Sequence, residues 1–467
     1  MAQAPTASRG QRVRQMGLQW LFDIAGPFHI SGAVVLLPFI QDDYAISTAA
    51  VAWAVVVYFL ATAVFTLPAA YLGNTAGRKK LVLIGTAIDM LSQFAIFLAP
   101  PFWLFVLVRL AGGAGNAMIV PNLNPITIGA YPRQRRGRAI GLIMLGLGFG
   151  MILSTLVAGI AADTAGWQYL FLLTGCMYAA LFAGVALFSR ESEALSPLPS
   201  ALKRMDYAGM LLLGALLVCL TMGVQRLGGS LTDPLGWALV GAAVPLAAVF
   251  VYAERRAPSP LAPLDLFAQR GFSAAVGQLF TMTMMRSAHA FLLPFYLIQG
   301  LGWSGSLAGS IQIALNAGQP VFGPVVGTLA DRRGARVFIL GAQALMAGGT
   351  IALMSLGAAP APVLVALSLG LIGASLGVFR PPNLKVIYDA VPPERMSLAP
   401  GVQLLTAHGS NAIGSSFVAV LLAFFLSGGA ANTEAYRSSL LVMVAGFVVV
   451  NAAIWLFARG GRAARGA

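Results

Sequence analysis

The sequence predicts an all-α membrane protein in which two six-helix bundles form a parallel pseudo-repeat and two extra spans lie between them. Three observations support this fold class. The chain is apolar, with 58% hydrophobic and 9% charged residues among 467 and a mean hydropathy of +0.82. Its apolar segments are about 20 residues long, which is the length of a membrane-spanning helix. Short motifs of the first half recur in the same order in the second half.

The apolar segments number fourteen. A chain in lipid must satisfy its own backbone hydrogen bonds, so segments of this length are expected to be helices. The first one is longer than the apolar core of a signal peptide, and no A-x-A-like cleavage site follows it, so we interpret it as a span. The expected spans are 17–40, 48–71, 81–99, 102–122, 139–161, 167–188, 207–225, 235–253, 272–298, 305–329, 336–357, 362–380, 398–426 and 436–458.

The basic residues predict the orientation. If the N-terminus is cytoplasmic, 25 of the 29 Lys and Arg residues lie in cytoplasmic segments, and the outer loops hold only Arg226 and Arg437. This asymmetry favours two cytoplasmic termini in a plasma membrane, such as a bacterial inner membrane. Contact of the basic loops with anionic lipids explains the net charge of +14 without a nucleic-acid partner.

An internal repeat divides the chain. "LLPF" occurs at 36–39 and at 292–295, Gly77 corresponds to Gly334, and "PNL" at 121–123 recurs at 382–384. The shared order and spacing predict duplicated bundles related by an axis along the membrane normal. The expected units are an N-terminal bundle, a linker containing a two-helix hairpin, and a C-terminal bundle, at residues 1–190, 191–270 and 271–467.

Several motifs resemble those of the major facilitator superfamily. "GTLADRRGAR" at 327–336 is similar to its G-x-x-x-D-R-x-G-x-R signature, and "RLAGGAGNA" at 109–117 is similar to its fourth-span motif, with Gly112 where glutamine is usual. Glycines of the fifth span match the family's antiporter motif, although Ser154 and Thr155 replace its Gly-Pro. The fourteen spans further resemble the drug:proton antiporter branch, which implies alternating access and export.

The charged loop between the second and third spans of each half suggests a cytoplasmic latch. The C-terminal copy carries the complete family-like motif, in which a carboxylate near a helix N-terminus is stabilised by the helix dipole and can pair with arginines. The N-terminal copy has a neutral asparagine in place of the acid. A solvated loop that only obeys the positive-inside rule is the alternative. The expected latch residues are Asn74, Gly77, Arg78, Asp331, Arg332, Gly334 and Arg336.

Ionisable residues inside apolar spans are costly, so they are functional candidates. The resemblance implicates Arg109 in proton coupling, usually opposite an acid of the first span. Here the nearest first-span acid is Asp23, and His29 lies where the branch has an acid, so Asp23 and then His29 are the expected proton carriers. For each membrane histidine, an interhelical hydrogen bond is the alternative. Asp89 belongs to the third span, which the family places at the periphery, and a structural contact is at least as consistent with that position.

Polar residues at helical spacing suggest a cavity. Thr62 follows Tyr58 by one turn, and three amides recur at i, i+4 and i+7 in the span 305–329. Hydrogen bonding between helices is the alternative, particularly for threonine. The small residues Gly146, Gly150, Ser154, Ala158 and Ala162 predict close helix packing instead. The cavity or substrate candidates are Tyr58, Thr62, Asn116, Arg286, His289, Gln312, Asn316, Gln319 and His408.

These features favour a secondary active exporter of amphipathic small molecules, acting as a monomer and driven by a proton gradient. No P-loop pattern is present that would power transport by ATP, and no metal or organic cofactor is expected. A facilitator or uptake carrier for a small metabolite is an alternative. A membrane enzyme or sensor on the same scaffold is a third, but it would need a clustered nucleophile and base or a metal-ligand pattern. The excess of basic over acidic residues inside the spans predicts a preference for neutral or anionic substrates over dications. The alternative is that Arg109 and Arg286 are already paired, which leaves a neutral cavity that selects by shape and apolar contact.

Overall fold

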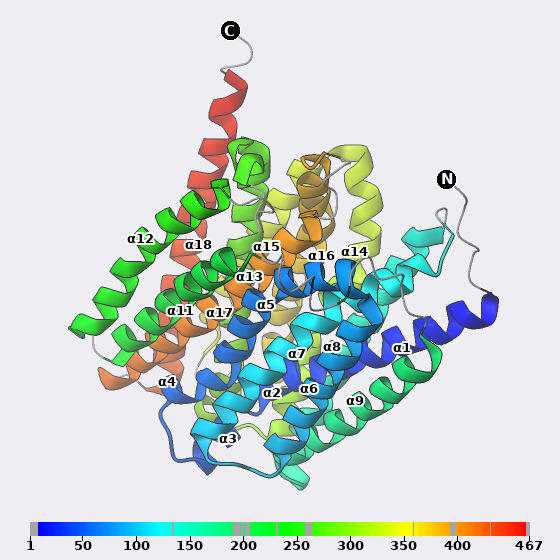
Figure 1. The fold of residues 1–467 in the computed structure, drawn as a ribbon. Helices are drawn as coiled ribbons and strands as arrows, with labels where there is room; N and C mark the ends of the chain where they lie inside the picture. Colours follow the sequence, from blue (N-terminus) through cyan, green and yellow to red (C-terminus); the bar gives the residue numbers. More distant parts are fainter. Residues whose placement is uncertain are drawn as a thin grey trace.

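The computed structural model describes residues 8–132, 135–189, 197, 200, 206–229, 232–256, 264–357, 359–392, 398–429 and 431–463. Within these ranges all regular secondary structure is helical (Figure 1). Much of the connection from 190 to 205 and from 257 to 263, which belongs to the expected linker, lies outside them, as do the basic residues Arg133, Lys203 and Arg204.

The first half forms one set of packed helices. Helix α7 contacts α5 and α6, and α9 contacts α6 and α1. In chain order the elements are α1 (Arg9–Pro27), the π-helical segment η1 (Phe28–Gly32), α2 (Ala33–Val35), α3 (Leu37–Asp43), α4 (Thr48–Val51), α5 (Trp53–Ala76), α6 (Arg78–Phe97), α7 (Phe102–Gly129), α8 (Arg136–Thr164) and α9 (Gln168–Phe188).

The second half repeats this arrangement. Helix α16 contacts α14 and α15, in the way that α7 contacts α5 and α6, and α13 contacts α17 and α18. The elements are the 3₁₀ turn η3 (Leu264–Ala268), α13 (Arg270–Pro294), the π-helical segment η4 (Phe295–Gly300), α14 (Gly305–Arg333), α15 (Ala335–Ser355), α16 (Pro362–Asp389), α17 (Leu398–Ser427) and α18 (Asn432–Ala463).

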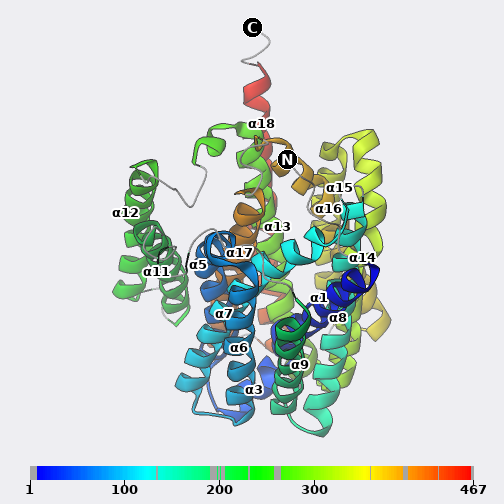
Figure 2. The same ribbon diagram turned by 45° about the vertical axis from the view of Figure 1, so that its right-hand side comes forward.

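The two halves meet along two helix pairs, α5 with α17 and α8 with α14. Because α14 is the counterpart of α5 and α17 that of α8, the pairs are equivalent under the repeat. The inserted helices α11 (Tyr207–Gly229) and α12 (Pro234–Arg256) pack on each other, and α11 also contacts α17 and α5. Figure 2 shows this hairpin at the side of the molecule, so it leaves the centre to the two halves.

The first span is bent rather than straight. The segments Arg9–Val35 and Leu37–Asp43 meet at an angle of 61°. This break lies at Leu36, after η1. Within the first segment, α1 ends at Pro27, and the five residues of η1 widen the helix directly after it. Proline removes a backbone donor, and a π-helical turn contains an extra residue, so both features turn side chains away from their regular α-helical positions.

A helix occupies each of the fourteen expected segments, but not all of them have the hydropathy of a span. Eleven described helices are long and apolar enough to cross a membrane, and the bent first helix makes twelve. The two that fall short are α13 and α14, whose polar residues include Gln278, Arg286 and Gln312. Helix α13 is enclosed by α16, α17 and α18, so it does not need an apolar surface on every side. Fourteen spans and the cytoplasmic termini remain predictions.

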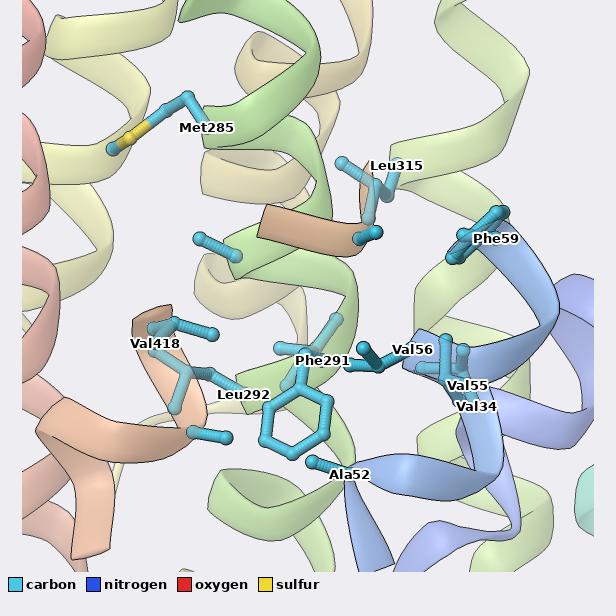
Figure 3. Packing of buried hydrophobic residues seen from close by; sticks show 14 of the residues in the cluster. Val34, Ala52, Val55, Val56, Phe59, Met285, Phe291, Leu292, Leu315 and Val418 are labelled. Atoms are coloured by element: carbon cyan, nitrogen blue, oxygen red, sulfur yellow. The ribbon is translucent and has the colours of Figure 1, made fainter. Parts of the chain in front are cut away.

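The apolar core is continuous across the interface between the halves. Buried residues of the first half, including Val34, Val55 and Phe59, belong to the same cluster as Phe291 and Val418 of the second (Figure 3). The two halves are therefore held together mainly by apolar contact, which is non-directional and permits rearrangement of one half against the other.

Small residues let the main chains approach closely. The expected ladder of α8 is confirmed as a packing surface, because Gly146 and Gly150 face Asp23 and Ile24 of the first helix, while Ser154 and Ala158 face Gly32. The crossing of α14 and α16 is equally tight. A Cβ atom at Gly373 would lie 2.5 Å from the carbonyl oxygen of Leu315, and Gly318 faces the backbone of Gly373.

This crossing generates a stability prediction. Gly318→Ala places a methyl group against the backbone of α16, so we expect a destabilisation of about 1–3 kcal/mol from overpacking. Gly323→Ala in the same helix is the control, because nothing lies within 4 Å of its added Cβ. Thermal unfolding of the purified protein in detergent should therefore show a lower midpoint for Gly318→Ala only. Equal midpoints would contradict the close crossing.

Candidate functional site

A cluster of ionisable side chains lies inside the first half. The Nε2 atom of His29 is 2.8 Å from the hydroxyl oxygen of Tyr58 and 3.6 Å from Oδ2 of Asp89. The side chains of His29 and Asp89 are both fully buried. They come from η1 and α6, and Tyr58 comes from α5, so the cluster joins three elements that are distant in the sequence.

Arg109 of α7 completes the cluster. Its Nη1 donates to the carbonyl oxygen of His29 at 2.9 Å, and its Nε donates to that of Ala54 at 2.7 Å. The guanidinium carbon lies 4.6 Å from the ring centroid of Tyr58, a cation–π contact. Because His29 belongs to a π-helical segment, its carbonyl lies outside the regular α-helical pattern and can accept this bond. Arg109 thus fixes η1 and the start of α5 relative to α7.

Only one carboxylate oxygen of Asp89 forms a hydrogen bond. Its Oδ1 accepts a hydrogen bond from Nε2 of Gln93 at 2.7 Å, whereas Oδ2 has no hydrogen-bond partner and faces His29. Nδ1 of His29 also has no hydrogen-bond partner. Buried polar atoms are normally paired, since an unpaired one costs about 1–3 kcal/mol. The nitrogen of His29 that faces Asp89 is Nε2, which also contacts the hydroxyl of Tyr58, so a proton that moves between this acid and base does so in competition with the tyrosine.

Asp89 points into the first half, although the family resemblance places its span at the periphery. Its side chain is buried because α6 lies directly against the glycine-rich part of α7, where a Cβ at Gly112 would be 3.3 Å from Asp89 Oδ1. Tyr178 of α9 closes the other side, with its ring 5.4 Å from that of His29. Asn116 lies beside the two tyrosines. The glycine pattern at 112–115 is the sequence signal that could have indicated the close approach of α6.

Asp23 lies in a different environment. Its Oδ1 accepts from Nε2 of Gln19 at 2.9 Å, and the same amide nitrogen donates to Oδ1 of Asn124 at 2.9 Å. Asp23 is buried where α1 packs on Gly146 and Gly150 of α8. The structure therefore does not bring together Asp23 and Arg109, and it places His29 and Asp89 near that arginine instead. Coupling through Asp23 stays an untested prediction.

A small cavity lies between the two halves. It has a volume of about 30 Å³ and is lined from η1 by Ile30 and Ser31, from α5 by Val55 and Phe59, and from the second half by polar residues. The polar lining residues are Arg286, Ser287, Gln312, Asn316, Asn411 and Ser415. Sites for drug-sized molecules measure about 300–1,000 Å³. The two halves must therefore separate before such a molecule can enter.

Several predicted cavity residues do not line this cavity. The hydroxyl of Thr62 donates to the carbonyls of Tyr58 and Gly113 at 2.8 and 3.1 Å, which corresponds to the alternative of packing between helices. Tyr58 and Asn116 belong to the ionisable cluster. Gln319 is not a lining residue, whereas Arg286, Gln312 and Asn316 are. Asn411 is an additional lining residue that helical spacing alone did not indicate.

The histidines of the second half differ from each other. His289 is fully buried, with Nδ1 2.8 Å from the carbonyl of Met285 and Nε2 3.0 Å from the hydroxyl of Thr350. Both ring nitrogens are used, so the interhelical hydrogen bond is the correct interpretation. His408 has no hydrogen-bond partner at Nδ1, and its ring centroid lies 6.1 Å from that of Phe59, a cavity residue.

The expected latch is described in part. Gly77 and Gly334 have positive φ values of 109° and 84° and end α5 and α14 in equivalent turns, which only glycine adopts readily. Arg78 donates to Asn74 Oδ1 at 2.7 and 3.2 Å, and the guanidinium of Arg336 lies over Trp455 at 5.2 Å. Arg332 is exposed. The side chain of Asp331 lies outside the described part of the structure, so the latch stays a prediction.

The contrast between the two histidines gives a direct test. His289→Ala removes two buried hydrogen bonds and leaves Thr350 without a side-chain partner, so we expect a clearly lower unfolding temperature. His408→Ala removes a ring with an unpaired nitrogen, and we expect little change in that temperature. Thermal unfolding of both variants in one detergent decides this. A larger loss for His408→Ala would reverse the assignment.

Comparison with known proteins agrees with this architecture. The sequence pattern of the Major Facilitator Superfamily matches residues 25–280 and 274–466. The chain is 29% identical over 405 residues to the multidrug resistance protein Stp of Mycobacterium tuberculosis, covering 84% of this chain and 72% of that protein. It is 26% identical over 393 residues to the tetracenomycin C resistance and export protein of Streptomyces glaucescens, covering 83% and 71%. A crystal structure of a POT family transporter has the same fold, with a TM-score of 0.71 at 16% identity over 96% of both chains.

The family match extends over nearly the whole sequence. This chain is therefore an integral membrane transporter of the major facilitator superfamily.

Proposed function

We propose that the protein exports amphipathic small molecules in exchange for protons by alternating access. The observation that carries this proposal is the position of η1. One residue of this segment, His29, faces Asp89 in the ionisable cluster, and the next two, Ile30 and Ser31, line the cavity between the halves. A change of charge in the cluster can therefore act on the cavity through the main chain of η1, in which His29 directly precedes these two lining residues.

The proton step follows from the surroundings of Asp89. The groups that face it are His29 of η1, Tyr58 of α5, Arg109 of α7, Tyr178 of α9 and Gln93 on its own helix. Electrostatic interactions are strong in such a dry interior. While Asp89 is ionised, its charge balances Arg109 and favours the observed position of η1. Protonation removes this balance and weakens the attraction that holds η1 against α6.

Export requires that proton and substrate binding oppose each other. Substrate binding that favours the ionised state of Asp89 releases a proton, and protonation favours release of the substrate. A membrane that is more acidic outside then drives substrate outward. The names of relatives as resistance and export proteins support this direction. We further propose that the protein acts as a monomer in a bacterial inner membrane, with both termini in the cytoplasm.

Transport in proteoliposomes tests this function. Ethidium, riboflavin and dansylglycine provide one cationic, one neutral and one anionic probe, and at least one should be accumulated against its gradient when a pH gradient is imposed. Asp89→Asn should reduce this accumulation about tenfold or more, since neutral asparagine cannot exchange the proton. Exchange of labelled for unlabelled probe needs no net proton transfer and should persist.

Asp23→Asn is the matched control, because it neutralises the other buried carboxylate of the first half. It should retain most of the pH-driven accumulation. Loss of coupling in Asp23→Asn together with normal coupling in Asp89→Asn would refute the assignment. Equal transport with and without the pH gradient would favour a facilitator instead.

A further inference from the structure

The interior of the second half is basic. Arg286 of α13, Arg380 of α16 and His408 of α17 lie within its helices, whereas the described acids of this half lie near helix ends, as Asp389 and Glu434 do. In the part of the chain that the structure describes, neither arginine forms an ion pair. The first half is different, because its buried arginine lies near Asp89.

One of these three groups lines the cavity between the halves, and His408 lies beside a lining residue. Arg286 lines it directly, together with Gln312, Asn316 and Asn411. His408 lies one helical turn before Asn411, and its ring is next to Phe59, which is another lining residue. The charge of Arg380 acts on both Arg286 and His408, so the three form one electrostatic group.

Arg109 shows how a buried arginine is hydrogen-bonded in the first half. It donates to two backbone carbonyls and covers a tyrosine ring. Among the described residues, Arg286 and Arg380 have neither a hydrogen bond to a carbonyl nor an aromatic partner of this kind. Nδ1 of His408 and Nε2 of Gln312 are buried polar atoms without partners. His408 and Gln312 thus each have one buried polar atom available to a ligand, and the partly exposed guanidinium groups of Arg286 and Arg380 have no acceptor among the described residues.

Like charges in weakly polar surroundings repel each other, so two arginines without a counter-ion are unfavourable. An anion that binds between them removes this cost, and a carboxylate matches the planar fork of a guanidinium. Resting on the transport function proposed above, we propose that Arg286, Arg380 and His408 form a subsite for the carboxylate of an amphipathic acid. Its apolar part lies against Phe59, Val34 and Phe291, which line the same cavity.

The opposite preference is physically unfavourable. A cationic drug entering the cavity meets Arg286 without an acidic lining residue to compensate its charge. Neutral molecules avoid this repulsion but gain nothing from the arginines. The subsite therefore selects by charge sign, while Phe59 and its apolar neighbours select by shape.

Binding to the purified full-length protein in detergent tests the subsite without any pH gradient. Dansylglycine, dansylamide and dansylcadaverine share one fluorophore and carry an acidic, a neutral and a basic group. We expect dansylglycine to bind about tenfold or more tightly than dansylcadaverine, the effect of a charge-assisted hydrogen bond. Equal or tighter binding of dansylcadaverine overturns the proposal.

Variants of the two arginines test whether they bind dansylglycine. Arg286→Gln and Arg380→Gln should each weaken dansylglycine binding about tenfold and leave dansylamide binding unchanged. Arg286→Lys and Arg380→Lys keep the charge and should recover part of the affinity, which separates the subsite from general unfolding. Arg226→Gln is the control, since Arg226 is 49% exposed and pairs with Asp233 at 3.0 Å. Unchanged dansylglycine binding in both glutamine variants overturns the assignment.

A lipid phosphate could supply the same anionic chemistry. Dansylglycine binding is therefore repeated with added phosphatidylglycerol and with added phosphatidylcholine. A substrate subsite predicts the same affinity in both lipids, whereas displacement by phosphatidylglycerol alone assigns the arginines to lipid and overturns the proposal. These binding measurements involve no proton gradient. If coupled transport fails but dansylglycine is still bound selectively, only the transport mechanism is refuted.

Discussion

The hydrogen bonds of Arg109 to the carbonyls of His29 and Ala54 are the interaction on which the rest of the site depends. A buried guanidinium must find acceptors, and here the acceptors are main-chain atoms of η1 and the start of α5. These bonds hold His29 against Asp89 and Tyr58. They also hold Ile30 and Ser31 at the cavity, because both residues belong to the same π-helical segment.

The two halves have the same fold but contain different ionisable side chains. The first half contains a buried acid, a histidine and an arginine that is bound to backbone, which suits a protonation site. The second half contains Arg286 at the cavity, His408 beside it and Arg380 within the same half, which suits an anionic ligand. A symmetrical scaffold gives both halves the same freedom to move, since the α5–α17 and α8–α14 interfaces are equivalent. Because the two halves carry different side chains, binding of a proton in the first half can affect binding of a substrate in the second half through the shared cavity.

Hydropathy and repeats predicted the helices and the order of the two halves. Both depend on long segments, in which many residues contribute to the same apolar pattern. Spacing along one helix fixes which side chains share a face, and two members of the amide stripe, Gln312 and Asn316, line the cavity, whereas Gln319 does not. Relations between helices were harder to predict. The family resemblance placed the third span at the periphery, which did not show that Asp89 points inward, where Gly112 and its neighbours let α6 pack directly on α7.

The limits of the sequence are also visible at individual residues. The expected span 362–380 ends at Arg380, which makes this residue look like a loop cation, whereas α16 continues to Asp389. His289 and His408 look alike in sequence and differ only through partners on other helices, namely Thr350 and Phe59. The π-helical turn after Pro27 has no simple residue pattern, although it decides where His29 and Ser31 point.

Proton release on ligand binding is the most direct measurement of the central claim that Asp89 and His29 couple protons to the cavity. A pH indicator in weakly buffered detergent solution reports the protons released when a binding probe, such as riboflavin or dansylglycine, is added to the purified protein. The account predicts release of up to about one proton per bound molecule for the unmodified chain, and none for Asp89→Asn at equal occupancy. Equal release by the two proteins would contradict it.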